Sequence, residues 1–483
     1  MKLSKHIQNN INYILKTNNN SSDIITRYLS KKIGYIFLES VSSDDKISQF
    51  LNQAIVENNP KTKLFQTIKK KLFNSNVKTI NDLNQVFTYL ANGFTVIFIE
   101  GNKEAITVET RSMLDRGVTE SNVEPVIRGP KDSFTENHPK NIGLIRKRIK
   151  DDQLFFCDIN IGRRSKTRIS IAYINDIADL NKVNQIKDIL NNIDIDAIID
   201  SGYIRDFLEK ENTLFPKVIS TERPDLVCTS LLNGKVALLI ENSPTVLILP
   251  GLFIDFIHSP EDYYQKPFNV TFNRLLSLIC FIITITIPAF YIALMTFNQE
   301  LIPDELLIQL TNQRMGIPFP TALEVLSFVI VFEILREADI HTPKIAGSAI
   351  SIVGALILGD AAVSAGIVSP IVIIIVAITS ISELVFYDVD MINAVRFWRI
   401  VYIIASFFLG IIGFVSISFI FVTKLSSIVS FDTPYLTPIS PLSITGIKNY
   451  LFRIERNKLF KRPKYLSDNT RKMVNHEESN LTN

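Results

Sequence analysis

The sequence predicts an α+β cytoplasmic N-terminal region of two similar subdomains, followed by an α-helical multi-pass membrane domain. Three observations lead to this fold class. Charged residues make up 20% of the 483 residues, but they are concentrated before about residue 273, whereas long apolar runs lie between 275 and 423. The first region repeats a hairpin pattern. One apolar run, Ile345–Ser382, is nearly twice the length of about 20 residues that one membrane helix needs.

The repeat relates residues 86–110 to residues 227–251. Both segments end a helix-like stretch at Asn-Gly, continue as a β-prone run, turn at Glu100 or Glu241, and return as a second apolar strand. Each is preceded by a further strand pattern, at 32–39 and 168–175. The predicted domains are then a polar N-terminal extension (1–24), two α+β subdomains (25–150 and 151–255), a membrane domain (265–425) and a basic tail (426–483). Chance similarity of two hairpins is the alternative.

The first region carries no recognisable catalytic motif. It has no GxGxxG sequence, no HExxH sequence and no phosphate-binding loop at Gly234-Lys235. Three cysteines are too few for a disulfide framework, and the five histidines are not spaced as metal ligands. We therefore expect no enzyme, no cofactor, no metal and no nucleic-acid partner. The start of the chain lacks a signal-peptide core, so this region should stay in the cytoplasm.

Two polar stretches of the first region stand out. Residues 128–150 begin as a Gly-Pro loop and end as a basic helix that carries Arg146, Lys147, Arg148 and Lys150. This helix is either a solvated face or a contact with a partner domain or anionic lipid. Residues 221–225 have the pattern of a helix start with Pro224 near its first position.

Two apolar segments each predict one membrane span. Residues 275–297 carry no charge and contain Pro288, which predicts a kinked helix. Residues 400–423 are also free of charge, and Trp398 with Arg396 and Arg399 precedes them as anchors at the headgroup level.

A weaker span is predicted over 319–338, because it contains Glu324 and Glu333. Nine residues on a helix turn through about 900°, so the two carboxylates point to opposite faces. Arg336 can pair with Glu333, which leaves Glu324 in need of a neighbouring helix, water or another subunit. An amphipathic helix that lies along the membrane surface is the alternative.

The basic tail and the first region should both be cytoplasmic, which requires an even number of crossings. Five apolar segments then predict four spans and one re-entrant element, with spans near 275–297, 319–338, 345–386 (broken) and 400–423. The break falls in 359–370, where small residues also permit close helix packing. The candidates for lining a pore or packing helices are Gly359, Asp360, Ala361, Val363, Ser364 and Gly366, and the intramembrane polar candidates are Glu324 and Glu333.

Several longer motifs resemble the A subunit of the GerA-type spore germinant receptors. They include GPKDSFTENHPKNIGLIRKRIK (129–150), FPKVISTERPD (215–225), EDYYQKPFNVTFNRLL (261–276) and IVGALILGDAAVSAGIVSP (352–370). They occur in the right order and cover about 125–450 closely. At position 360 many family members have Gln or Glu, so this chain departs from the pattern there.

The resemblance implies a multi-pass protein of the spore inner membrane that assembles with B and C subunits and acts in nutrient-triggered germination. It also implies a homo-oligomer that forms a ligand-gated ion channel in contact with membrane lipids. A non-conducting scaffold that couples partner subunits to cytoplasmic machinery remains open. A secondary transporter ranks lower, because the two membrane halves show no inverted repeat.

Overall fold

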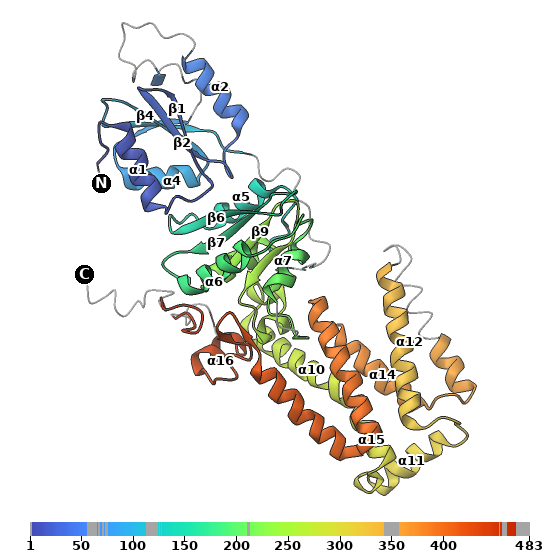
Figure 1. Ribbon diagram of the computed structural model, residues 1–483. Helices are drawn as coiled ribbons and strands as arrows, with labels where there is room; N and C mark the ends of the chain where they lie inside the picture. The colour runs from blue at the N-terminus through green and yellow to red at the C-terminus, as the bar shows by residue number, and fades with distance from the viewer. Residues whose placement is uncertain are drawn as a thin grey trace.

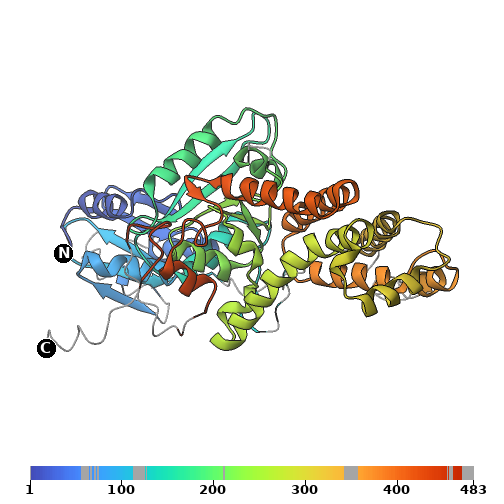
Figure 2. The same cartoon turned by 90° about the horizontal axis from the view of Figure 1, so that it is seen from below.

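Two sheet domains and a helical region follow one another along the chain (Figure 1). The computed structural model describes residues 2–55, 65, 68–69, 72, 76–112, 124, 126, 128–209, 213–341, 357–453, 455 and 461–469. The helical region extends away from the sheet domains, and the last described segment returns to them (Figure 2).

The first sheet domain has five antiparallel strands in the order β1-β2-β4-β5-β3. One face of this sheet is covered by α1 and α4, and Ile47 of α2 packs on the other face. Its elements are α1 (Ile7–Thr17), β1 (Ile24–Ser30), β2 (Ile33–Leu38), α2 (Asp44–Ile55), β3 (Val77–Ile80), α4 (Leu83–Ala91), β4 (Phe94–Ile99) and β5 (Ala105–Glu109). All six residues of β4 are buried, as expected of a central strand that is covered on both faces.

The second sheet domain has the same strand order, β6-β7-β9-β10-β8. Its elements are α5 (His138–Arg148), β6 (Leu154–Ile161), β7 (Thr167–Ile174), α6 (Leu180–Asn191), α7 (Ser201–Leu208), β8 (Ile219–Thr221), α8 (Pro224–Leu232), β9 (Val236–Ile240) and β10 (Val246–Leu249). Helices α5 and α8 cover one face, and α6 and α7 cover the other. The repeated sequence segments lie on α4-β4-β5 and on α8-β9-β10, which occupy equivalent places in the two domains.

Two domain boundaries differ from the sequence prediction. The predicted extension (1–24) contains α1, whose Ile7, Ile11 and Ile14 are buried against the first sheet. These isoleucines lie on one face of an amphipathic helix. The segment was predicted as a polar extension because its overall composition is polar and rich in Asn. The basic helix α5 belongs to the second sheet domain, because Ile142 and Ile145 lie in its core. The two helices precede their sheets in the same way, so the repeat includes them.

A buried ion pair joins the two sheet domains. Arg146 of α5 donates from Nε to Asp23 Oδ2 at 2.8 Å and from Nη2 to Asp23 Oδ1 at 3.0 Å. Both side chains are at most 1% exposed. The guanidinium also lies over the ring of Phe87 from the first domain and the ring of Phe156 from the second. Arg146 is therefore an interdomain contact, and the solvated-face interpretation is wrong for this residue.

The helical region starts with two short elements, α9 (Phe253–Ile257) and the 3-10 helix η1 (Pro260–Tyr263). The long helix α10 (Pro267–Thr296) follows, and then the 3-10 helix η2 (Gln299–Leu301). The remaining helices are α11 (Asp304–Arg314), α12 (Thr321–His341), a helical segment over 357–364, α14 (Pro370–Glu383) and α15 (Val389–Ser427). Two described helices, α10 and α15, have the length and apolar composition of membrane spans. Helix α10 continues through Pro288.

Helix α15 is a hairpin of two arms. Gly410 has φ 57° and ψ −136°, which ends the first arm. Trp398 then packs on Phe421 with ring centroids 4.9 Å apart, and Tyr402 packs on Phe414 at 5.7 Å. In both pairs one ring precedes Gly410 and the other follows it, and the pair that is farther from Gly410 on one side is also farther on the other. The two arms are therefore antiparallel. The prediction of one span over 400–423 is therefore wrong, because Gly410 divides this range between the two arms.

Glycines make this hairpin possible. A Cβ on Gly410 would lie 2.8 Å from Cβ of Phe297, and a Cβ on Gly413 would overlap the backbone oxygen of Ala405 on the other arm. A residue outside α15 also stabilises the turn, because the backbone N–H of Ile411 donates to Asn298 Oδ1 at 3.3 Å. Trp398, predicted as a headgroup anchor, is buried between the arms instead.

The segment after α15 returns to the second sheet domain. It contains the ladder of β11 (Val429–Ser430) with β12 (Thr433–Pro434), and helix α16 (Ile444–Tyr450). Lys182 Nζ of α6 donates to Thr433 Oγ1 at 2.9 Å, and Ser467 Oγ donates to the backbone oxygen of Ile177 at 2.5 Å. Both ends of the helical region are thus attached to the same sheet domain.

Replacing Arg146 with methionine should destabilise the interface between the sheet domains. Removal of one partner of a buried ion pair costs about 3–5 kcal/mol, because the other charge stays buried without compensation. We expect calorimetry of the detergent-solubilised chain to show a lower unfolding temperature for R146M, and recovery in the double variant with Asp23→Leu. The exposed pair of Arg163 with Asp194 gives the control, and R163Q should leave the temperature nearly unchanged. Equal shifts in R146M and R163Q would contradict this role.

Candidate functional site

The predicted break in the long apolar run corresponds to a turn over 365–369. The helical segment over 357–364 ends there, Gly366 has φ +66°, and Ser369 precedes α14. The first part of the run, 345–356, lies outside the described residues. Gly359 is half-buried, and a Cβ at this position would lie 3.8 Å from the side chain of Ile373 on α14.

The other candidates of this segment lie mainly on its surface. Asp360, Ala361 and Ser364 are exposed, and Val363 is half-buried. Residues 360, 361 and 364 share one face of a helix, because positions three and four apart are neighbours on its surface. This face carries one carboxylate and two small side chains.

Glu324 holds the turn in place. Its side chain is fully buried, and its Oε2 accepts from Ser369 N at 3.1 Å and from Ser369 Oγ at 3.0 Å. Its Oε1 accepts from Arg314 Nη2 of α11 at 3.2 Å. A carboxylate beside the first free amides of α14 also interacts favourably with the helix dipole. Glu324 thus links α11, α12 and the turn.

Glu333 belongs to a second cluster, together with Glu383, Arg336, Arg396 and Arg399. Glu333 is paired with Arg396 at 3.0 Å and with Arg399 at 2.5 Å. Glu383 is paired with the same two arginines, at 2.9 and 2.8 Å, and also with Arg336. The cluster therefore ties α12, α14 and the first arm of α15 together.

The structure revises how these charges were expected to pair. Glu333 contacts two arginines of α15, and Arg336, its predicted partner on the same helix, contacts Glu383 of α14. Glu324 and Glu333 lie in separate clusters, nine residues or about 13 Å apart along α12. Sequence reasoning missed Glu383, although a single carboxylate at the end of an apolar stretch was a signal.

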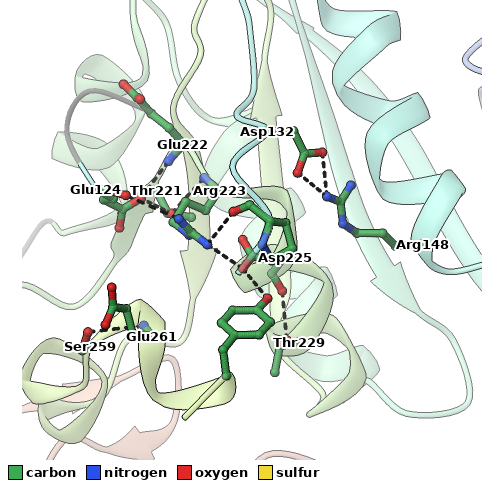
Figure 3. Close-up of polar contacts among 12 residues, drawn as sticks. Glu124, Asp132, Arg148, Thr221, Glu222, Arg223, Asp225, Thr229, Ser259 and Glu261 are labelled. Carbon is green, nitrogen blue, oxygen red and sulfur yellow. Dashed lines mark hydrogen bonds and ion pairs between the residues drawn. The ribbon is translucent and has the colours of Figure 1, made fainter. Parts of the chain in front are cut away.

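A third polar cluster lies where the second sheet domain meets the helical region (Figure 3). Arg223 Nη2 donates to Asp225 Oδ2 at 2.8 Å and to the backbone oxygen of Pro130 at 3.1 Å. Tyr264, at the start of the helical region, donates from its hydroxyl to the same Asp225 oxygen at 2.5 Å. Close by, Arg148 Nη2 bonds both oxygens of Asp132 at 2.6 Å.

This cluster brings three of the quoted sequence motifs together: the loop before α5, the turn before α8, and the segment before α10 (Figure 3). Helix α8 does begin at Pro224, with Pro at its first position. However, Arg223 is 2% exposed and spans the junction, which the local helix-start pattern could not indicate. A small cavity of about 220 Å³ adjoins the cluster.

The cavity is lined from both sides of the junction. Its lining includes Glu124, Arg205, His258, Tyr387 and Asp388. Burial raises the pKa of Glu124 to about 7 and the pKa of Asp388 to about 6. Arg205 is paired with Asp390 at the start of α15. The junction therefore contains carboxyl groups that change charge near neutral pH.

Among the described residues, no three His, Cys, Asp or Glu side chains are grouped so that they could hold a metal ion.

Comparisons with known proteins agree on one family. The family model described as "Bacillus/Clostridium GerA spore germination protein" matches residues 12–465. The chain is 40% identical to spore germination protein KA of Bacillus subtilis (strain 168) over 403 residues, which is 83% of this chain and 74% of that protein. It is 35% identical to spore germination protein XA of Bacillus anthracis over 402 residues, which is 83% of this chain and 82% of that protein.

A solved structure is also similar. It is the crystal structure of the N-terminal domain of the A subunit of the Bacillus megaterium spore germinant receptor GerK3. The two chains are 28% identical with a TM-score of 0.42, and the match covers 52% of this chain and 98% of that one.

Replacing Glu324 with alanine should destabilise the turn. The variant leaves the buried N–H of Ser369 without an acceptor, and an unsatisfied buried polar group costs about 1–3 kcal/mol. We expect a lower unfolding temperature by calorimetry in detergent. Glu305→Ala on the exposed face of α11 is the control and should have little effect. Equal unfolding temperatures for E324A and the unmodified chain would argue against the linking role.

Glu124 should make the stability of the junction depend on pH. Its folded-state pKa of about 7 lies above the ordinary value of 4.5, so between these values the folded chain binds more protons than the unfolded chain. Stability therefore falls as the pH rises through this window, by roughly 3 kcal/mol in full. We expect Glu124→Gln to flatten the decrease in unfolding temperature between about pH 5 and pH 8, with a residual decrease from Asp388. The exposed Glu104→Gln control should keep the full pH dependence.

Proposed function

Because this chain belongs to the GerA family of spore germination proteins, we propose that it is the A subunit of a germinant receptor and that its helical region contributes an ion-conducting path. Its partners would be the B and C subunits, and it would reside in the spore inner membrane. Homologues named as spore germination proteins over most of their length support the role in germination. The conducting path is supported by the broken helices and by the exposed face at 360–364.

The alternation of the helices supports several membrane crossings. Gly410 at the hairpin tip lies against Phe297, which follows α10, so these ends share one side of the region. The start of α12 is joined to the turn before α14 through Glu324 and Ser369. Glu383, at the other end of α14, contacts arginines of α12 and α15. We propose that α10, α12, α14 and both arms of α15 cross in alternation. The apolar run 345–364, in which Asp360 is the one charged residue of the sequence, would supply the sixth crossing.

Six crossings satisfy the parity that the sequence requires. They keep the sheet domains and the returning tail on one side of the membrane, as the contact of Ser467 with Ile177 demands. The sequence prediction of four spans and one re-entrant element counted α15 once; the hairpin adds one crossing, and the element predicted as re-entrant adds the other as a full crossing. Helix α14 has 14 residues, which is about 21 Å and short for the hydrocarbon core. Such a short element needs protein or water around its ends.

The face formed by Asp360, Ala361 and Ser364 carries the channel proposal. A lone carboxylate between apolar neighbours at membrane depth is costly unless it meets water or a polar partner. This face is exposed in the single chain, so copies of the chain could close around it and form a water-filled path. Small residues at 361 and 364 would allow the close approach that such an assembly needs.

Enlarging Ala361 or Val363, or adding a positive charge at Ser364, should change ion conduction. We expect Ser364→Lys to reduce cation conductance roughly tenfold, since a charge that adds about 1.4 kcal/mol to the barrier has that effect. The measurement is the conductance of the purified chain in planar bilayers, with and without the partner subunits. Ser427→Lys, at the exposed end of α15, is the matched control and should leave conductance unchanged.

Unchanged conductance in all three variants at 361, 363 and 364 would rule out this path. If the same variants instead released the partner subunits during purification, the non-conducting scaffold would be the better description.

A further inference from the structure

The exposed apolar face of α10 continues beyond the charge-free run that begins at Leu275. Each residue advances a helix by about 100°, so the exposed large apolar side chains of α10 all fall within a sector of about 120°. They are Phe268, Phe272, Leu275, Leu276, Ile279, Ile282 and Phe290. The first two precede the charge-free run and are 83% and 61% exposed. The apolar face therefore extends about two turns toward the sheet domains.

The tail after α15 adds a third exposed ring beside these two turns. Arg274 Nη1 donates to the backbone oxygen of Tyr450, the last residue of α16, at 2.5 Å. The backbone N–H of Arg453 donates to Thr271 Oγ1 at 3.1 Å. Phe452 lies between Tyr450 and Arg453 in the chain and is 44% exposed. Because both contacts are made with the first two turns of α10, Phe452 lies at the level of these turns.

The three rings have the depth of the lipid headgroup layer. A helix rises 1.5 Å per residue, so Phe272 lies about 4.5 Å and Phe268 about 10.5 Å outside Leu275. Thr271, which sets the level of Phe452, lies about 6 Å outside it. The headgroup layer is about 5–7 Å thick on each side of a bilayer. Amphipathic segments bury their apolar faces about 5–10 Å into the boundary between headgroups and acyl chains.

Exposed lysines lie at the same end of the helical region. Lys266 directly precedes α10, Lys424 lies in the last turn of α15, and Lys448 lies in α16. The sequence from 448 to 464 contains seven Lys or Arg residues and one Glu. Anionic headgroups attract cations that lie next to a membrane span. A second copy of this chain would bring the same positive charges to this surface, so its approach would be opposed.

We propose that Phe268, Phe272 and Phe452, together with Lys266 and Lys448, insert into the anionic headgroup layer of the membrane on the side of the sheet domains. We call these five residues the anchor surface. The rings reach the acyl boundary, and the lysines interact with lipid phosphate groups. This inference rests on the membrane crossing of α10 given under the proposed function, and it does not depend on ion conduction.

The anchor surface would fix the position of the second sheet domain relative to the membrane. The tail is bound to that domain on both sides of Phe452 in the sequence. Lys182 Nζ donates to Thr433 Oγ1, and Ser467 Oγ donates to the backbone oxygen of Ile177. Loss of anionic lipid would release the tail from the membrane surface. The junction between the second sheet domain and α10 would then be held less firmly.

Variants with a single tryptophan test the anchor surface. The chain has one tryptophan, Trp398, so Trp398→Phe gives a background in which Phe268→Trp or Phe452→Trp is the sole emitter. The full chain is reconstituted into phosphatidylcholine vesicles with about one third phosphatidylglycerol, with and without bromine on the acyl chains. We expect bromine to lower the emission from both positions at least about twofold, because the rings reach the acyl boundary.

Two control positions bracket the anchor surface. Ile282→Trp lies on the same face of α10 within the charge-free run and should be quenched at least as strongly. Tyr28→Trp, on β1 of the first sheet domain, is 55% exposed and should not be quenched. Quenching at 282 without quenching at 268 and 452 would overturn the inference and leave the crossing of α10 intact. Absence of quenching at 268, 282 and 452 would overturn both.

Unfolding temperatures show which variants are folded, and one folded variant at 268 or 452 suffices for the comparison with position 282.

Replacing both lysines of the anchor surface with glutamine tests its preference for anionic lipid. In the Phe452→Trp background, K266Q with K448Q should reduce the quenching in anionic vesicles to the level in pure phosphatidylcholine, since each lysine shifts the partition of the anchor about fivefold. Arg164→Gln removes an exposed cation of the second sheet domain and should change nothing. Equal quenching in both kinds of vesicle would contradict the inference. A blue-shifted emission that bromine does not lower would also contradict it and would indicate a second copy of the chain on this surface.

Discussion

The buried contact of Arg146 with Asp23 determines how the two sheet domains of this molecule are assembled. Two domains with the same strand order are joined where one guanidinium is shared by a carboxylate and by aromatic rings from both sides. A charge that is removed from water requires a partner with good geometry, so the two domains cannot separate at this point without a large cost.

Charged groups also organise the helical region, where the apolar side chains alone would permit many packings. Glu324 reaches the turn before α14, and the cluster around Glu383 holds the opposite end of that helix. A helix that begins in a buried turn leaves free backbone N–H groups that need partners. Here, a buried carboxylate supplies the partner at Ser369. The same contacts explain why α12 contains glutamates within an otherwise apolar sequence.

Between these two halves, the junction around Arg223 and Asp225 connects the second sheet to the start of α10 (Figure 3). The tail that follows α15 attaches to the same sheet domain through Lys182 and Ser467. A displacement of the second sheet domain would therefore be transmitted to both the first and the last helix of the helical region. The carboxyl groups of the adjoining cavity give this junction a charge that responds to pH.

Much of the fold was predictable from the sequence, because it rests on local patterns. Hydrophobic alternation and Asn-Gly turns predicted the paired hairpins. Charge-free runs predicted α10 and, as one span only, the apolar stretch of α15, and the parity of the crossings with the small residues predicted a break within 359–370. The long motifs predicted the family. The hairpin at Gly410, the burial of Trp398 and the partners of Arg146, Glu324 and Glu333 were decided only by the tertiary structure. Each depends on residues 20 to more than 120 positions apart, and a one-dimensional pattern contains no information on which distant charge will neutralise a buried one. Only the packed helices and sheets bring such partners within hydrogen-bonding distance.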